Sequence, residues 1–427
     1  FLRSIFANPL SSLTYIGFTE IMLYGQGFVP EAVLTSDLVQ LPRRQNLISI
    51  EWEGTTPDGT GIQLRTRTGN ELKELKIFHD NNGNVVTESR YKRLPSSKKG
   101  EVTITFEPSD DWSAWSEPYT RSGEEITSPS PRQFLQLRAT LVTDRSDTAA
   151  TLRSVAVNMS DPVAGQLLGE IWPVRVGRIG AVEEFSIFVR PSFSSATQRF
   201  DEVKVEATGG TRMEVVGVRL GSDSDFESGV ATLIPAADLE VLSTSPDTLW
   251  LRLPQAVRRG TDLMAIEVRS AILGNSASFR TFVRDSGGSV HWQRVDPGEA
   301  TPLVASQTFT VLALEGSDVL IDFQIARPVL SPNGDGINDD LEVTFSVARV
   351  SGDRDVTFAI FDLSGHRVRE VIERRGELRG QYSMVWDGRD EAGHVVAPGI
   401  YLARVEVEAD ASSANQTSLQ RPVYVAY

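Results

Sequence analysis

The chain of 427 residues contains no cysteine. Disulfides, zinc or iron–sulfur sites with thiolate ligands, and thiol nucleophiles are therefore excluded. Only four histidines occur, and no pair of them has the spacing of a metal-binding motif. The sequence also lacks a phosphate-binding loop, a dinucleotide fingerprint and a Gly-x-Ser-x-Gly elbow. Since no catalytic constellation is recognisable, we expect a protein that is not an enzyme.

Basic residues are also in the minority, with 42 Lys and Arg against 57 Asp and Glu and a net charge of −15. Nucleic-acid phosphates need a basic surface, so this balance argues against a nucleic-acid partner. No run of eighteen apolar residues is present, and we expect no transmembrane segment. The first residues lack both an initiator Met and the features of a secretory signal. We therefore expect a processed product of a longer precursor.

What the chain does contain is apolar content of 40%, enough for packed cores, and a length that suggests about three domains. The last unit is predicted at residues 323–427. Apolar and polar residues alternate over 341–347, 356–360, 382–386 and 401–407. This period of two is typical of half-buried strands. Turn residues separate the four segments, which predicts a β-sandwich of the immunoglobulin type.

Four motifs in this unit carry a specific resemblance. They are Ser331-Pro-Asn-Gly-Asp-Gly-Ile-Asn-Asp339, Phe361-Asp-Leu-Ser-Gly-His-Arg-Val368, Trp386-Asp-Gly-Arg-Asp390 with Gly393, and Pro398-Gly-Ile-Tyr401. The unit resembles the FlgD-like immunoglobulin domain and is similar to the C-terminal sorting and gliding-motility domains of bacterial secreted proteins. The resemblance implies an exported protein whose last domain serves attachment or export. A flagellar role does not follow, because a fold does not define a function.

The first of these motifs is also a candidate calcium site. Asn333, Asp335 and Asp339 supply side-chain oxygens at odd positions, and Ile337 offers a backbone carbonyl. Calcium prefers oxygen ligands from such loops. The alternative is a turn that uses Asn, Asp and Gly for their backbone tolerance. The sequence leaves both interpretations open.

Residues 33–160 are predicted to form a fibronectin-like sandwich with a long polar insertion at 69–100. Trp112-Ser-Ala-Trp115-Ser116 is similar to the Trp-Ser-x-Trp-Ser box of fibronectin-type modules. In that box the tryptophan faces stack on guanidinium groups of a neighbouring strand, by cation–π contact. The arginines that fit this role are Arg65, Arg67 and Arg138. The alternative is an aromatic platform at Trp112 and Trp115 that binds glycans.

Residues 161–322 are predicted to form another sandwich. Six strands are indicated at 185–191, 200–206, 213–218, 249–254, 263–268 and 278–283. The spacers between the predicted domains are short, so we expect modules stacked end to end.

Residues 1–32 form a short lead-in. The stretch at 15–31 resembles the closing strand of a discoidin-like domain, which implies that the rest of that domain lies upstream. The alternative is that it belongs to the following sandwich. The unpaired backbone N–H and C=O groups of such an edge strand can pair with a strand of another chain.

Taken together, the sequence predicts an all-β chain of tandem antiparallel β-sandwiches. We expect a non-enzymatic, exported bacterial protein, located extracellularly or at the cell surface, with a structural or adhesive role. Its partners would be other copies of itself or other cell-surface proteins. Strands at 1–32 and 423–427 would pair between subunits to build a filament, sheath or surface layer. The alternative is a carbohydrate-binding accessory module of a larger secreted protein.

Overall fold

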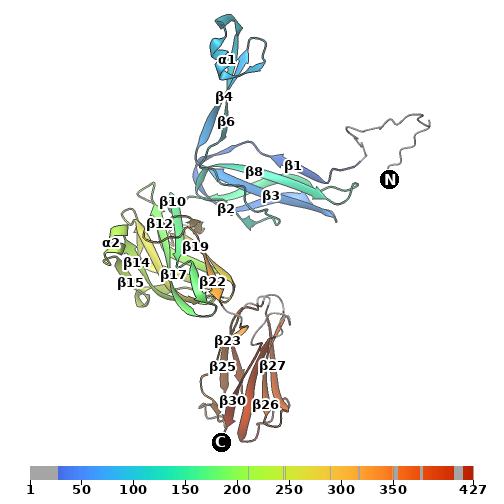
Figure 1. Ribbon diagram of the computed structural model, residues 1–427, viewed down its shortest axis with the longest axis vertical. Helices are drawn as coiled ribbons and strands as arrows, with labels where there is room; N and C mark the ends of the chain where they lie inside the picture. The colour runs from blue at the N-terminus through green and yellow to red at the C-terminus, as the bar shows by residue number, and fades with distance from the viewer. Residues whose placement is uncertain are drawn as a thin grey trace, which may run out of the picture.

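The computed structural model describes residues 27–209, 211–243, 245, 247–288, 290–315, 318–348, 350, 354–375, 378–407 and 417–426. Three β-sandwich domains follow one another along an elongated molecule, and an arm projects from the first (Figure 1). We refer to residues 27–160 as domain 1, 161–315 as domain 2 and 318–426 as domain 3. The predicted all-β architecture of tandem sandwiches is confirmed. Among the described helices, none has the length and apolar character to cross a membrane.

Domain 1 is organised around one long strand that changes sheets. Its strands are β1 (Glu31–Thr35), β2 (Val39–Thr55), β3 (Thr60–Gly69), β7 (Glu124–Glu125), β8 (Arg132–Thr143) and β9 (Thr151–Ser160). The first part of β2 pairs with β8, which also pairs with β1 and β3, and the second part of β2 pairs with β7 and β9. Ile50, Leu64 and Tyr119 are buried between the two sheets. The predicted discoidin-like stretch lies mostly outside the described residues, whereas residues 31–35 belong to domain 1.

The insertion predicted as a polar loop is instead an ordered arm. It consists of β4 (Leu72–Asp80), β5 (Val85–Val86), α1 (Glu88–Arg93), η1 (Ser96–Lys98) and β6 (Lys99–Pro108). β4 and β6 pair from Leu72 and Pro108 outward, so the arm is a two-stranded ribbon. At its end the rings of Phe78 and Tyr91 lie 4.9 Å apart, and Val86 is buried. The prediction was wrong because polar residues dominate the composition and obscure this small apolar centre.

Domain 2 contains two large sheets, with strand orders β15-β14-β18-β12-β10-β21 and β11-β22-β19-β13-β17-β16. Its elements are β10 (Gln166–Trp172), β11 (Arg175–Arg178), β12 (Val182–Ser192), β13 (Arg199–Ala207), β14 (Met213–Gly221), α2 (Asp223–Glu227), β15 (Thr232–Pro235), η2 (Ala236–Asp238), β16 (Glu240–Val241), β17 (Thr248–Arg258), β18 (Leu263–Ala271), β19 (Ser276–Arg284), β20 (Gln293–Arg294), β21 (Asp296–Pro297) and β22 (Thr310–Glu315). All six predicted strands are present, as β12, β13, β14, β17, β18 and β19. β10 pairs in parallel with β21, and β11 pairs in parallel with β22. Each sheet therefore contains both parallel and antiparallel pairs.

Domain 3 packs a three-stranded sheet, β23-β25-β28, on a five-stranded sheet, β24-β30-β29-β26-β27. The strands are β23 (Leu320–Ile325), β24 (Val329–Leu330), β25 (Leu341–Val347), β26 (Arg354–Asp362), β27 (Arg367–Arg375), β28 (Gly380–Trp386), β29 (Gly399–Val407) and β30 (Ser418–Val425). The alternation seen in the sequence follows burial. Tyr382, Met384 and Trp386 face the core, as do Tyr401 and Ala403.

The C-terminal strand is not the free edge that was predicted for pairing between subunits. Tyr424 and Val425 pair with β24 on one side and with β29 on the other. Earlier in β30, Pro422 lacks an N–H, which prevents it from donating to a strand added at this edge. The prediction of a free edge is therefore wrong at Tyr424 and Val425, because β24 already occupies the position. Tyr427 lies outside the described residues.

Candidate functional site

The tryptophan box of domain 1 forms a ladder with arginines. The guanidinium carbon of Arg67 lies 5.6 Å from the ring centre of Trp112 and 4.7 Å from that of Trp115, and Arg138 lies 4.2 Å from Trp115. Arg65 does not stack but donates a hydrogen bond of 2.9 Å to the carbonyl of Ser116. The pKa of Arg67 is lowered by burial and by the nearby charge of Arg138. The tryptophan faces are thus occupied by the chain's own cations.

The same box covers an open edge of the sheet. Backbone N–H groups of Ser113 and Ser116 donate to the carbonyls of Thr68 and Thr66 in β3, at 2.9 and 2.8 Å. The hydroxyl oxygens of both serines accept hydrogen bonds from N–H groups of β3 in return. Exposed edges of this kind attract foreign strands. The geometry therefore supports a structural role for the box, which satisfies the backbone hydrogen bonds along the edge of β3.

Domain 2 contains a second ladder that the sequence did not reveal. Arg284 lies 5.3 Å from the ring centre of Trp250 and 4.6 Å from that of Trp292, and Lys204 lies 5.1 Å from Trp292. The fully buried carboxylate of Glu202 accepts hydrogen bonds from Arg284 and Arg252. The carbonyl of Trp292 also accepts a hydrogen bond from Asn46, so the ladder lies against domain 1.

The junction between domains 1 and 2 is a buried polar network. Arg294 donates hydrogen bonds to the carbonyls of Thr127 and Ser128, at 2.6 and 3.0 Å. The carboxylate of Asp296 is only 6% exposed and lies 3.7 Å from Arg132 and 3.5 Å from Arg294. Burial raises the pKa of Asp296, and the two guanidinium groups oppose this shift. These directional contacts fix how domain 1 sits on domain 2.

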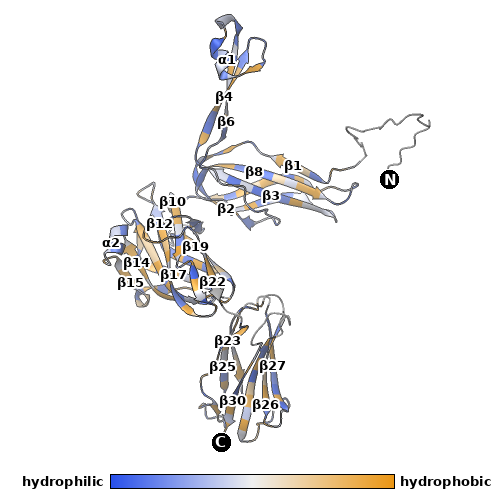
Figure 2. Cartoon of the chain, viewed as in Figure 1, coloured by the Kyte–Doolittle hydropathy of each residue, from blue (hydrophilic) through white to orange (hydrophobic). Residues whose placement is uncertain are grey.

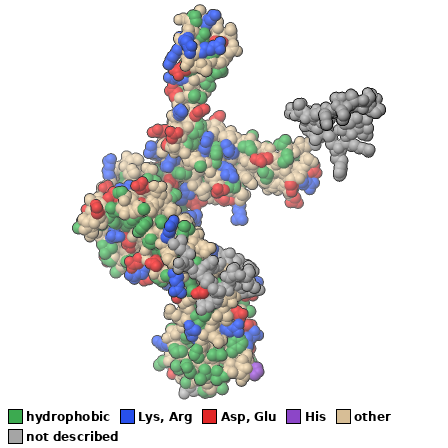
Figure 3. Space-filling view, in the orientation of Figure 1, with side chains coloured by type: hydrophobic (Ala, Val, Ile, Leu, Met, Phe, Trp, Pro, Cys, Tyr) green, Lys and Arg blue, Asp and Glu red, His purple; other side chains and the backbone are tan. Residues whose placement is uncertain are grey.

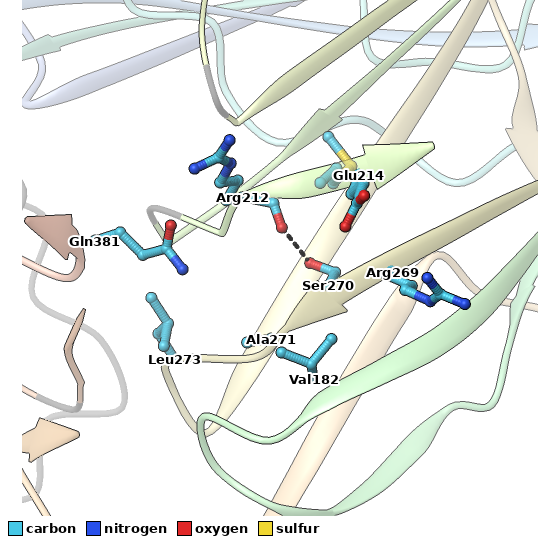
Figure 4. A pocket seen from close by; sticks show the side chains of 9 residues that line it. Val182, Arg212, Glu214, Arg269, Ser270, Ala271, Leu273 and Gln381 are labelled. Atoms are coloured by element: carbon cyan, nitrogen blue, oxygen red, sulfur yellow. Dashed lines mark hydrogen bonds between the residues drawn. The ribbon is translucent and has the colours of Figure 1, made fainter. Parts of the chain in front are cut away.

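Apolar contacts join domain 2 to domain 3. Ile179 and Leu273 of domain 2 pack with Ala348 and Ile321 of domain 3. Gly180 has a φ of +80°, and a Cβ at this position would lie 2.1 Å from Ile321. Beside this contact is a cleft of about 390 Å³, lined by Arg212 and other residues of domain 2 and by Gln381 of domain 3 (Figure 4). Both junctions thus hold their neighbouring domains in direct contact.

The loop proposed as a calcium site is held by hydrogen bonds of its own. Both carboxylate oxygens of Asp339 accept backbone N–H groups, from Gly334 and Gly336, each at 2.7 Å. Asp335 accepts hydrogen bonds from Asn333 and Ile337. Calcium would have to compete with these bonds for its ligands. In the part of the chain that the structure describes, no three His, Cys, Asp or Glu side chains gather as a metal site. The geometry favours the turn, and calcium binding stays a prediction.

Replacing Asp339 by Ala should destabilise domain 3 in a pH-dependent manner. The N–H groups of Gly334 and Gly336 hold the pKa of Asp339 below its usual value of 3.8. A carboxyl group with a lowered folded-state pKa stabilises the fold above its usual pKa and loses this effect as the pH falls through the folded pKa. Thermal unfolding at pH 7 should show a lower midpoint for D339A than for the parent, and the difference should shrink at pH 2.5.

The neighbouring exposed residue provides the control. Asp340→Ala removes the same charge without these backbone hydrogen bonds and should leave the midpoint unchanged. An equal effect of D339A at both pH values would show that the carboxylate charge does not hold the loop. Adding calcium to the parent in the same assay tests the alternative interpretation, since a bound ion would raise the midpoint at pH 7.

One apolar edge of domain 1 remains open. β1 pairs only with β8 within the described residues, and it lies at the end of its sheet. Val33 and Leu34 of this strand are about half exposed, as are Phe28 and Val29 just before it. By contrast, the outer strand β27 carries a dense set of charged side chains, which discourages strand addition. The edge at β1, as described from Glu31 to Thr35, is thus better suited than β27 to pairing with another chain.

Comparison with known proteins identifies the last domain. The sequence model described as the FlgD Ig-like domain matches residues 334–411, while no curated protein matches the chain. Among solved structures, latent PorU from Porphyromonas gingivalis has 11% identity and a TM-score of 0.22, with 93% of this chain and 34% of PorU covered. This chain therefore spans about a third of PorU.

Two pilins are among the similar structures. The major pilin BcpA of Bacillus cereus has 7% identity and a TM-score of 0.23, covering 86% of this chain and 95% of BcpA. The major pilin SpaD from Corynebacterium diphtheriae has 10% identity and a TM-score of 0.24, covering 84% and 83%. At TM-scores this low the likeness implies no shared function. The resemblance noted in the sequence is confirmed for the C-terminal domain, since residues 334–411 match the FlgD Ig-like domain.

Proposed function

We propose that this chain is a non-enzymatic structural or adhesive component of the bacterial cell surface, and that it associates with copies of itself. The observation that carries the proposal is the pair of domain junctions. Asp296 and its arginines fix one junction, and the packing of Ile179 on Ile321 fixes the other. Three sandwiches held in this way form an extended body of defined length, which suits a load-bearing or spacing role.

Two further observations support the location and the self-association. The FlgD Ig-like model matches residues 334–411. The resemblance of this domain to C-terminal modules of bacterial secreted proteins implies a role in attachment or export. The exposed apolar edge at β1 can accept a strand from another subunit. Glycan binding at Trp112 and Trp115 is less well supported, because their faces are stacked on Arg67 and Arg138.

Electron microscopy of the purified full chain tests this function. We expect ordered polymers or lattices in which an elongated repeat corresponds to one subunit. Analytical ultracentrifugation over a wide concentration range provides the quantitative check, with association that increases with concentration. A chain that stays monomeric under all conditions would contradict the self-association part of the proposal.

A further inference from the structure

The arm at residues 72–108 projects from domain 1 in a fixed direction. At its base the carboxylate of Asp111 accepts the N–H groups of Asn70 and Glu71, at 2.6 and 3.3 Å. The indole N–H of Trp112 donates to the carbonyl of Glu71 at 2.7 Å. The ribbon of β4 and β6 extends from this anchored base away from the three sandwiches (Figure 1). The arm contributes to neither domain junction. The extended body of three sandwiches therefore does not account for its presence.

The ribbon presents apolar side chains to solvent. Ile104 and Phe106 of β6 are 52% and 56% exposed. They lie opposite Lys76 and Glu74 of β4, and residues that face each other in this way share one side of the ribbon. Hydrophobic residues recur along the arm in Figure 2. A two-stranded ribbon is marginally stable when it is uncovered, and exposed apolar groups at the centre of a polar rim are typical of a contact surface.

The head of the arm has the opposite charge to the rest of the molecule. Residues 81–100 contain five basic side chains and only one acidic residue, Glu88, for a net charge of +4. Asp80 and Glu101 flank this segment, and counting them reduces the excess to +2. The basic residues are Arg90, Lys92, Arg93, Lys98 and Lys99, and all five are exposed. Since the whole chain carries −15, the remaining residues carry −19. Figure 3 shows Lys and Arg gathered on this head.

The most distant part of the molecule is acidic. Residues 331–342 contain four acidic residues and no Lys or Arg, and residues 386–395 contain three acidic residues and one Arg. The two segments adjoin, because Gly388 lies against Pro332. They follow β24 and β28 at the free end of domain 3, near the C-terminus and far from the arm (Figure 1). Arg327 and Arg369 also reach these segments, through Asn338 at 3.1 Å and Glu391 at 3.8 Å, so the seven carboxylates exceed the three arginines by four. A single molecule therefore carries an excess of opposite charge at each of its two ends.

We propose that the arm docks on the free end of domain 3 of a second copy of this chain. This inference rests on the proposed self-association and adds a second pair of contacting surfaces to the β1 edge. Basic side chains of the head face the acidic segments 331–342 and 386–395 of the second copy. The exposed apolar side chains of Ile104 and Phe106 are buried in the same contact. A contact between two different surfaces of identical subunits is heterologous, and it continues into a filament unless the rotation closes a ring.

Charge reversal on the head tests the proposal. In the variant R93E/K98E the head has no net charge, and both substituted side chains lie outside the contact between Phe78 and Tyr91. Charges at the rim of an interface chiefly affect its association, so we expect the association of subunits to be weakened by about tenfold or more in 0.1 M salt. The parent should show a comparable loss in 1 M salt, where charges are screened within about 3 Å. Sedimentation velocity measures both.

A matched control separates this effect from net charge. The variant R153E/R259E makes the same change at exposed positions of β9 and of the turn after β17, and it should associate as the parent does. The variant D340K/E342K should weaken association like the head variant. Combining D340K/E342K with R93E/K98E should restore part of it, since direct pairs between these four positions are re-formed with the signs exchanged, although the substituted head carries no net charge.

The outcomes distinguish this inference from the proposed function. If the parent never associates, both fail. If the parent associates and R93E/K98E associates equally well, only the docking of the arm is overturned. If R93E/K98E leaves association unchanged but loses binding to dextran sulfate, the head serves an anionic polymer, which also overturns docking on a second copy. Rescue by the combined variant supports the docking directly.

Discussion

Replacing Asp296 by Ala should produce one of the largest losses of stability in this chain. Its carboxylate is 6% exposed and lies between Arg132 and Arg294, which are themselves only 13% and 19% exposed. Without the carboxylate, two guanidinium groups would remain in a poorly hydrated site with no opposite charge. Breaking a buried ion pair by removing one partner typically costs about 3–5 kcal/mol. Urea unfolding monitored by tryptophan fluorescence should show this loss.

The change should also loosen the junction. Ser130 would lose the acceptor for its backbone N–H, which now donates to Asp296 at 3.3 Å. Small-angle X-ray scattering should therefore show a broader distribution of intramolecular distances for D296A. Asp262→Ala, at an exposed position, is the control for the loss of one negative charge and should behave like the parent. Equal unfolding curves for D296A and D262A would show that the network does not join the domains.

Removing the Asp296 carboxylate alone costs more than the intact ion pair contributes to stability. The pKa of Asp296 is raised by burial despite two adjacent arginines, so folding disfavours the ionised form of this carboxyl relative to the unfolded chain. Buried ion pairs often contribute little beyond an apolar replacement of similar shape, but they specify one arrangement of their neighbours. We interpret the network as a device that selects one orientation of domain 1 on domain 2.

The strands of this chain could be predicted because their signal is local. In β28 and β29, alternation of apolar and polar residues gives the face that packs in the core, and Tyr382, Met384 and Trp386 are buried as this pattern requires. The motifs of the last domain have fixed turn residues, such as Asp362, which accepts N–H groups two and four residues later. Such short-range chemistry is readable from a sequence alone.

The junctions and the second ladder could not be predicted, because they depend on distant residues. Asn46 and Trp292 are 246 positions apart, and Ser130 and Asp296 are 166 positions apart. Nothing in the local pattern says which strand of one domain meets which loop of the next. The first ladder was accessible because Trp112 and Trp115 belong to a recognisable box. Trp250, Trp292 and Arg284 are spread over three segments, so their stacking appears only once β17 and β19 are placed.

The arm shows how composition can mislead. Residues 69–100 are rich in charged and polar side chains, which favoured a loop. An extended ribbon needs only a few apolar residues, and here Phe78, Val86 and Tyr91 close its end while Ile104 and Phe106 remain exposed. The charge of the head was visible in the sequence. Its position relative to the acidic end of domain 3 was not, because that relation depends on the whole length of the molecule.

Replacing Trp115 by Ala should destabilise domain 1 and reveal what the tryptophan box does. Trp115 lies between Arg67 and Arg138, at 4.7 and 4.2 Å, and each such contact contributes about 0.5–2 kcal/mol. Its loss would also leave the two arginines facing each other, which adds repulsion between like charges. We therefore expect the free energy of unfolding of domain 1 to fall by about 1–4 kcal/mol. Trp115→Phe keeps an aromatic face and should retain part of this energy.

The same variant separates the structural interpretation from glycan binding. If the ladder seals β3, W115A should unfold earlier in urea and should lose protection from hydrogen exchange at Thr66 and Thr68, whose N–H groups now donate to Ser116 and Ser113. If Trp115 is instead a sugar platform, W115A should unfold like the parent and lose binding on a glycan array. The two readouts are independent, because an exposed platform contributes contact area to a sugar, whereas a stacked ladder contributes rigidity to the edge that it covers.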